Sequence, residues 1–199
     1  MAIGNGVVRV RAGESLTQAW GSVRLRTTLA GDPSRIRSGD SRPLVDLVAL
    51  RGSSIQLPAM TAIPGMSGKM ITVSEITVDL FNQVMKGYEI TGHNAAQLKA
   101  LLADEKAAGT ALTYVSLLDA REFAKRLSDQ TGRKFRVQTE EEWSKARGQL
   151  SGNNWTWTET PYNDRTYVLR LLSYGSRNYD YPGLRYHNDA VRLVEDLAA

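Results

Sequence analysis

The stretch from Ser116 to Trp143 holds two helix starts with a strand between them, and it constrains the fold more than any other part of the chain. Ser116 and Asp119 have the spacing of a capping box, with Asp in place of the usual Glu. Apolar residues then recur at helical spacing, at Leu117, Ala120, Phe123, Ala124 and Leu127. Gly132 is well placed to end the helix, because glycine readily adopts the left-handed conformation that closes many helices. The pattern predicts an amphipathic helix whose apolar face packs in a core.

The segments around this helix predict further short helices and strands. Lys134–Val137 is typical of a strand, and Thr139 with Glu142 forms a second capping box that opens a helix carrying Trp143. Elsewhere we expect a strand over Met70–Ile76, a helix capped by Thr77 and running through Met85, a helix over Ala95–Ala108 capped by Asn94, and a last strand over Ala190–Leu197. Residues 150–190 consist of short polar runs that favour loops. The expected class is α+β, with short helices around small antiparallel sheets and much irregular loop.

The first sixty residues have a different pattern. Residues 6–30 alternate weakly between apolar and polar side chains, which favours half-exposed strands. Residues 31–42 are rich in Gly, Asp, Ser and Arg, a composition typical of loops. We therefore expect a strand-rich segment over 1–60, which completes the core or forms an oligomer interface, and a ligand-binding domain over 61–199.

Composition excludes several classes of protein. The chain has 199 residues, no cysteine, two histidines, a net charge of +4 and a pI near 9.4. Without cysteine there is no disulfide framework, thiol nucleophile or thiolate zinc site, and two histidines are too few for a three-histidine metal site. The positive charge is spread along the chain, so a solvated surface is favoured over nucleic-acid binding.

The sequence also bears on localisation. No apolar run reaches the roughly 18–20 residues of a membrane-spanning helix. The N-terminus lacks the basic start and the apolar stretch of a secretory signal. We expect a protein without membrane insertion that is either cytoplasmic or associated with a virion.

Several pieces between residues 70 and 197 resemble, in order, the formylglycine-generating enzyme family, a branch of the C-type lectin fold. The pieces are Ser74–Thr77 followed by Phe81, the helix from Val115 to Arg133, Phe135–Trp143, Gly152–Thr158, and the strands Val168–Arg170 and Val191–Val194. Phe135–Trp143 resembles the family's Arg-Leu-Pro-Thr-Glu-x-Glu-Trp signature, with Gln138 where proline is usual, and Gly152–Thr158 resembles its Gly-Asn-Val-Trp-Glu-Trp-Thr motif. The resemblance implies the family's fold, with Trp143, Trp155, Trp157, Arg170 and Arg192 as scaffold residues and Trp155 and Trp157 as a buried core pair.

The sequence departs from the family where the family's chemistry resides. Catalytic members hold copper with two cysteines, which would fall near Ser176 and Tyr181. Hydroxyl groups are poor ligands for Cu(I), so the resemblance implies a non-catalytic member without catalytic residues or cofactor. The family's Gly-Gly after the arginine is Leu171-Leu172 here, so the local loop differs. Members often carry calcium, for which Asn153, Asn154, Glu159, Asp164 and Asp180 offer oxygen ligands, but solvated loop carboxylates are the favoured interpretation.

Tyrosines are concentrated in one part of the chain. Six of the eight lie in 162–186, among Asn, Ser, Asp and His. Antibody binding sites have this composition, because tyrosine offers a large amphipathic contact area with little entropy to lose. We expect a binding surface for a protein or carbohydrate ligand that comprises Asn163, Asp164, Thr166, Leu171, Leu172, Tyr174, Ser176, Asn178, Tyr179, Asp180, Tyr181, Tyr186, His187 and Asn188. The alternative is a polar loop whose tyrosines pack at the edge of the core.

The same segment suggests diversification. Codons for Tyr, His, Asn and Asp differ only in their first base, so asparagine codons mutated at adenines drift into this set. Variable proteins of diversity-generating retroelements are similar, because they combine this fold, no catalytic cysteines and a hypervariable stretch before the last strand. The resemblance implies a fixed frame of Val168–Arg170 and Val191–Leu193 around a variable face at 171–188.

Two alternatives to the variable protein stay open. The first is a structural or receptor-binding virion protein without diversification. The second is an enzyme of the same fold that uses carboxylates from Asp119, Glu140–Glu142 and Glu159, with His93 or His187 as a base. Each of these, like the variable protein, is compatible with a homo-oligomer such as a trimer, which would strengthen weak single-site binding.

Overall fold

The computed structural model describes residues 47–50 and 53–197, and the chain divides between Leu57 and Pro58 into two compact units. In the first unit, β1 (Leu47–Leu50) and β2 (Ser53–Gln56) pair as an antiparallel hairpin. The strands expected within 6–30 and the loop expected at 31–42 lie outside the described residues. The role assigned to residues 1–60 stays a prediction.

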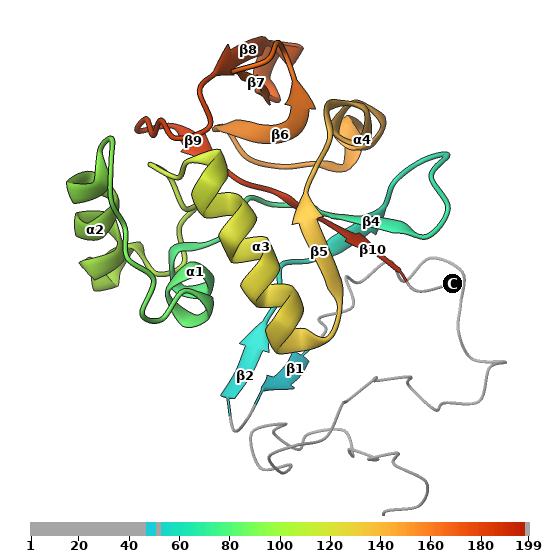
Figure 1. The fold of residues 1–199 in the computed structure, drawn as a ribbon. Coiled ribbons are helices and arrows are strands. Elements are labelled where there is room, and N and C mark those ends of the chain that lie inside the picture. Colours follow the sequence, from blue (N-terminus) through green and yellow to red (C-terminus); the bar gives the residue numbers. More distant parts are fainter. Residues whose placement is uncertain (1–46, 51–52, 198–199) are drawn as a thin grey trace, which may run out of the picture. The chain divides into compact units, whose positions relative to one another are not determined.

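The described part of the second unit contains two four-stranded sheets and four α-helices (Figure 1). The first sheet has the order β3 (Met60–Ala62), β4 (Lys69–Thr72), β10 (Leu193–Asp196), β5 (Lys134–Val137), and all its pairs are antiparallel. The second has the order β8 (Arg177–Asp180), β7 (Tyr167–Arg170), β6 (Trp155–Pro161), β9 (Asp189–Ala190), and only β6 and β9 are parallel.

The helices are α1 (Val78–Val84), α2 (Ala95–Ala103), α3 (Leu117–Thr131) and α4 (Glu140–Ala146). Three short 3-10 turns accompany them, η3 (Glu105–Ala107), η4 (Arg147–Gln149) and η5 (Ser173–Gly175). No helix in the described part of the chain is long and apolar enough to cross a membrane.

The structure confirms the predictions for the stretch from Ser116 to Trp143. Both capping boxes form, Ser116 with Asp119 and Thr139 with Glu142, and the predicted apolar residues of α3 are buried. Gly132 ends α3 in the left-handed conformation, with φ of 68°. The strand Lys134–Val137 has the predicted bounds. These features depend on residues a few positions apart, which is why a sequence pattern could predict them.

Three predicted elements have other bounds. The strand expected over Met70–Ile76 ends at Thr72, because the backbone of Val73 instead bonds Ala59 and Ser151. The helix expected over Ala95–Ala108 ends at Ala103, where Asp104 is extended and its carboxylate accepts the N–H of Lys106 at the start of η3. The strand expected over Ala190–Leu197 is split into β9 and β10 by the two residues between them.

The tryptophans occupy different environments. Trp157 is fully buried, and its indole N–H donates to the carbonyl of Val115 at 2.8 Å. Trp143 is also buried in the core. Trp155 is only half-buried, so the expectation of a buried pair is wrong for this residue. Trp155 is the first residue of β6, where the sheet covers the chain less completely than at Trp157.

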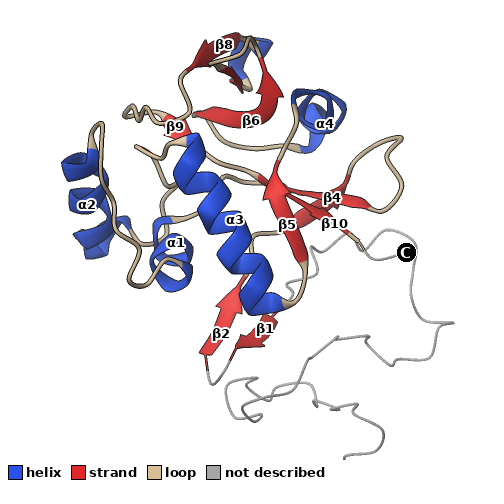
Figure 2. Cartoon of the chain, viewed as in Figure 1, coloured by secondary structure: helices blue, strands red, loops and turns tan. Residues whose placement is uncertain are grey.

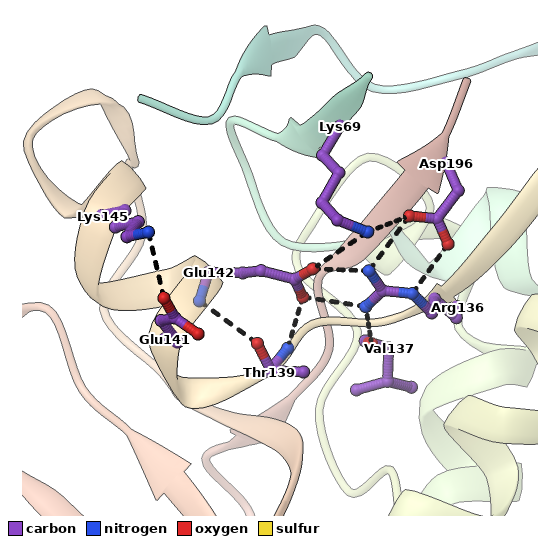
Figure 3. A network of polar contacts seen from close by, with 8 residues as sticks. All are labelled: Lys69, Arg136, Val137, Thr139, Glu141, Glu142, Lys145 and Asp196. Carbon is purple, nitrogen blue, oxygen red and sulfur yellow. Dashed lines mark hydrogen bonds and ion pairs between the residues drawn. The ribbon is translucent and has the colours of Figure 1, made fainter. Parts of the chain in front are cut away.

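A network of charged side chains joins four elements of this unit (Figure 3). The guanidinium of Arg136 on β5 donates to Glu142 on α4 at 2.5 and 2.8 Å and to Asp196 on β10 at 2.9 and 3.1 Å. Lys69 on β4 donates to Asp196 at 2.5 Å. Burial alone would raise the pKa of Glu142, but the hydrogen bonds from Arg136 and from the Thr139 backbone lower it below its ordinary value. The network fixes α4 against the first sheet.

The second sheet lies at the end of the unit where α3 begins (Figures 1 and 2). The backbone N–H of Leu118, in the first turn of α3, donates to the carbonyl of Pro182 at 3.1 Å. Helix α4 contacts β6 and β7 of the same sheet. The segment rich in tyrosine is therefore supported by two helices that begin with capping boxes.

We predict that the two tryptophans of β6 differ in their effect on stability. Trp157→Ala removes a fully buried indole and its hydrogen bond, and should lower the free energy of unfolding by about 3–5 kcal/mol. Trp155→Ala, at a half-buried position on the same strand, should lower it by clearly less. Urea denaturation of both variants and of the natural protein measures the two losses in the free energy of unfolding. Equal losses would contradict the different burial of the two side chains.

Candidate ligand-binding surface

The stretch 171–190, which carries four of the clustered tyrosines, is held at both ends by buried residues. Val168 and Leu169 of β7 precede it, and Val191, Arg192 and Leu193 follow it, all with little or no solvent exposure. Arg192 donates to the backbone carbonyls of Val73 and Ser151 and lies 3.5 Å from Glu75. Burial lowers the pKa of Arg192 to about 10, and the charge of Glu75 opposes this shift. Apart from the half-buried Arg170, the residues expected to form the fixed frame are thus part of the core.

Most tyrosines of the tyrosine-rich segment, residues 162–186, reach solvent. Five of the seven large hydrophobic side chains exposed among the described residues are tyrosines of this segment, namely Tyr162, Tyr174, Tyr179, Tyr181 and Tyr186. Tyr174 is the most exposed, at 96%. Leu118, a sixth exposed side chain, lies beside Gly183 of the same segment, at 3.8 Å from the position a Cβ would occupy there. The alternative of tyrosines packed at the core edge does not describe these five residues.

Strand β8 is at the edge of its sheet and directs its side chains to both faces. Tyr179 stacks on Tyr162 with 4.0 Å between ring centroids, and the guanidinium of Arg177 lies over Tyr162 at 5.5 Å. Asn178 and Asp180 alternate with these residues along the strand and therefore point to the opposite face. The expected binding residues on β8 thus belong to two faces that meet at the open edge.

The loop from Tyr181 to Asn188 is anchored by a residue that sequence analysis did not single out. Arg185 is 4% exposed, and its guanidinium donates to the buried carboxylate of Asp119 at 2.6 and 2.8 Å. It also donates to the carbonyls of Thr91 and His93 at 2.8 Å. Burial alone would raise the pKa of Asp119, but the hydrogen bonds from Arg185 and Ser116 lower it. Because 66 residues separate the pair, no local pattern could have revealed it.

Near Arg185, the exposed part of the loop packs lightly on the start of α2. The ring of Tyr186 lies 5.2 Å from that of His93, whose Nδ1 accepts the backbone N–H of Arg185 at 3.1 Å. His187 is exposed and Asn188 half-buried. Arg185 thus divides the predicted variable face into exposed positions on either side of a buried anchor.

The remaining predicted residues are placed as follows. Thr166 is buried, so it does not lie on the exposed surface as expected. Its carbonyl accepts the backbone N–H groups of Tyr162 and Asn163, which closes the turn at this point. Asn163 and Asp164 are exposed on that turn, and the Asn163 side chain accepts the backbone N–H groups of Arg165 and Thr166 at 2.9 Å. Leu171, Leu172 and Ser176 are half-buried around η5.

The side chains offered for calcium are not assembled as a site. Both oxygens of Glu159 accept from Arg121, and the amide of Asn154 donates to Glu75 at 3.1 Å. Asp180 accepts the backbone N–H of Tyr181 at 2.8 Å. Over the described ranges, no three His, Asp or Glu side chains are grouped as metal ligands. Glu159 and Asn154 are therefore already bound by other side chains of the protein.

Asp189, the residue that follows this loop, has a buried carboxylate. This carboxylate accepts the backbone N–H of Tyr186 at 3.0 Å. Burial raises its pKa to about 7, and the nearby charge of Asp180 adds to the rise, while the hydrogen bond from Tyr186 opposes it. The turn that carries Tyr186 and His187 is thus fixed by a carboxyl group that titrates near neutral pH.

The second unit has the C-type lectin fold of the formylglycine-generating-enzyme type, with exposed tyrosines on its second sheet and the adjoining loops. Residues 60–195 match the family described as the Sulfatase-modifying factor enzyme 1-like domain, and the chain belongs to this family. No curated protein matches the sequence.

Two solved structures are similar to this chain in fold. Treponema denticola variable protein 1 has a TM-score of 0.50 and 13% sequence identity over 78% of this chain and 100% of that chain. CarF has a TM-score of 0.51 and 16% identity over 77% of this chain and 99% of that chain. The fold is therefore shared with a protein named for its variability, within a family named for an enzyme.

We predict that Arg185→Ala destabilises the protein. Removing one partner of a buried ion pair leaves the Asp119 carboxylate without its counterion, which should lower the free energy of unfolding by about 3–5 kcal/mol. Arg165→Ala removes an exposed arginine of the same segment and should change it by about 0.5 kcal/mol or less. Thermal and urea denaturation compare the two variants. A small loss for Arg185→Ala would show that the loop does not depend on this anchor.

We also predict a pH-dependent effect of Asp189. Its pKa in the folded state lies above the value of about 3.9 for an unfolded aspartate, so the folded state holds the proton more tightly. The contribution of Asp189 to stability is therefore fully present below pH 4 and is lost as the pH rises to about 7. Asp189→Asn stays neutral, so its stability relative to the natural protein should increase between pH 4 and 7. A difference that is constant over this range would contradict the raised pKa.

Proposed function

We propose that this protein is a non-enzymatic ligand-binding protein that displays a variable surface on a stable C-type lectin scaffold. One observation supports this most directly: four tyrosines between residues 171 and 190 are exposed, while the residues just before and after this stretch, Val168, Leu169 and Val191–Leu193, are buried. The ligand is a protein or a carbohydrate on a target surface. The variable positions are the exposed and half-buried residues predicted between 171 and 188.

The distribution of burial suits such a role. Substitutions at exposed positions without special contacts change stability by about 0.5 kcal/mol or less, so these positions tolerate many side chains. Exposed tyrosines supply most of the contact area that a binding site needs, and a few aromatic residues usually dominate the binding energy. The buried frame and Arg185 keep the fold independent of the side chains displayed.

The absence of thiols argues against the family's copper chemistry. The chain has no cysteine, and the positions expected for the copper-binding pair hold Ser176 and Tyr181. The carboxylates considered for other chemistry already have structural partners. Asp119 is paired with Arg185, Glu159 with Arg121, and Glu140 with Arg170 and Arg177. None of these carboxylates is left free to act as a general acid or base.

The fold shared with a variable protein supports the idea that the surface is diversified, and the codon pattern of Tyr, His, Asn and Asp suggests how. We therefore predict that natural copies of the gene differ mainly at codons for Tyr174, Ser176, Asn178, Tyr179, Tyr181, Tyr186 and His187. The codons for Arg185, Val191 and Arg192 should be constant. Sequencing the gene and its flanks from related genomes tests this, and a near-repeat of the 160–195 coding region beside a reverse transcriptase is expected.

Copies that differ evenly along the chain would contradict diversification and favour a virion protein with an unvaried receptor-binding surface. The binding part of the proposal is tested separately with purified lysozyme as the probe. A displayed library of the seven varied positions should remain folded in most clones and yield lysozyme binders, whereas a library at Val168, Leu169 and Val191 should unfold. A surface library that unfolds, or yields no binder, would contradict a display function.

A further inference from the structure

Tyr174 combines two features that are unfavourable in a free protein. Its side chain is 96% exposed, so the aromatic ring gains nothing from burial. Its backbone has φ of 63° and ψ of 0°, in the left-handed region that residues other than glycine rarely adopt. A non-glycine residue in this conformation persists only where its surroundings hold it.

The surroundings of Tyr174 do hold it, through backbone groups on both sides. Arg147 donates to the carbonyl of Leu172 at 3.2 Å, and Arg170 donates to the carbonyl of Gly175 at 2.9 Å. Within the turn, Gly175 N–H donates to Leu172 at 3.2 Å and Leu171 N–H donates to Ser176 at 3.1 Å. All four hydrogen bonds end on main-chain carbonyls, those of Leu172, Gly175 and Ser176, so they do not require a particular side chain at position 174.

Both arginines lie over the ring of one buried tryptophan. The guanidinium groups of Arg170 and Arg147 lie 4.4 and 5.7 Å from the ring centroid of Trp143, which is 1% exposed. Arg170 also forms an ion pair with Glu140 at 3.0 Å. Gly175 allows this arrangement, because a Cβ at that position would lie 2.5 Å from Nη1 of Arg147. Gly175 also has a positive φ of 61°.

We propose that Tyr174 is a preorganised anchor that inserts into a concave pocket of the binding partner, and that Arg147 and Arg170 are positioning residues for it. This rests on the proposed binding function and adds the shape of the partner. A ring that projects freely is complementary to a pocket, whereas Tyr162 and Tyr179 are stacked on each other and suit a flat contact. The pocket takes one phenol ring, with apolar walls and a polar group for its hydroxyl.

The energetic reason for such bracing is that ordering a loop on binding costs conformational entropy and so reduces affinity. Here the backbone is already ordered in the free protein, and only two side-chain torsions of Tyr174 are left to restrict. Aromatic anchors that fill pockets are the residues that usually dominate binding energy.

The bracing is tested by ¹⁵N relaxation of the free protein. Tyr174 and Gly175 should have backbone order parameters near the rigid value of about 0.85, and Arg147→Ala should lower them below about 0.6. Arg165→Ala is the matched control, because it removes an exposed arginine of the neighbouring turn, and it should leave both values unchanged. Gly175→Ala should loosen the turn as Arg147→Ala does. Order parameters that are low in the natural protein, or unaffected by Arg147→Ala, would overturn the bracing.

The projection of Tyr174 is tested with β-cyclodextrin, a small host with a concave apolar cavity that takes phenol rings. On titration, the ring signals of Tyr174 should shift more than those of Tyr162 and Tyr179, and Tyr174→Ala should remove the largest shift. Larger shifts at the stacked pair would overturn the pocket complementarity. The relaxation and cyclodextrin measurements use no biological ligand. Both can give the expected result even if the lysozyme library yields no binder, so failure of this inference can be distinguished from failure of the proposed function.

Discussion

The buried carboxylate of Asp119 is the interaction on which the scaffold and its surface both depend. It has no solvent exposure and accepts hydrogen bonds from Ser116 N–H and Oγ, from Arg185 Nε and Nη2, and from the hydroxyl of Tyr88. A buried charge is tolerated only when such donors compensate its loss of water. The same group therefore fixes the start of α3 and the position of the loop carrying Tyr181, Tyr186 and His187. Helix and loop cannot shift independently.

Arginines directed at main-chain carbonyls recur around the surface. Arg147 and Arg170 hold η5, Arg185 holds the following loop to residues 91–93, and Arg192 holds the last strand to Val73 and Ser151. Guanidinium groups suit this task, because they are always charged and offer several donors in a rigid plane. Contacts made to the backbone survive a change of side chain at the acceptor. This is the physical basis on which a surface could vary while its fold stays constant.

Much of the fold followed from patterns a few residues long. The two capping boxes, the buried face of α3, the left-handed Gly132 and the strand Lys134–Val137 are local features, and each was predicted with its residues. Predictions about exposure were less uniform. The tyrosines at 174, 179 and 181 are exposed as expected, but Thr166 is buried and Trp155 is only half-buried. Burial at these two positions depends on neighbours that residue type alone does not reveal.

The sequence by itself determined the family, the order of the elements and the absence of thiol chemistry, because motifs, periodicity and residue identity are properties of the chain. Only the tertiary structure decided that Arg185 pairs with Asp119, that Asn178 and Tyr179 point to opposite faces of β8, and that Tyr174 projects from a braced turn. These features depend on groups far apart in the sequence. Their contacts are set by how the helices and sheets pack, which local patterns do not encode.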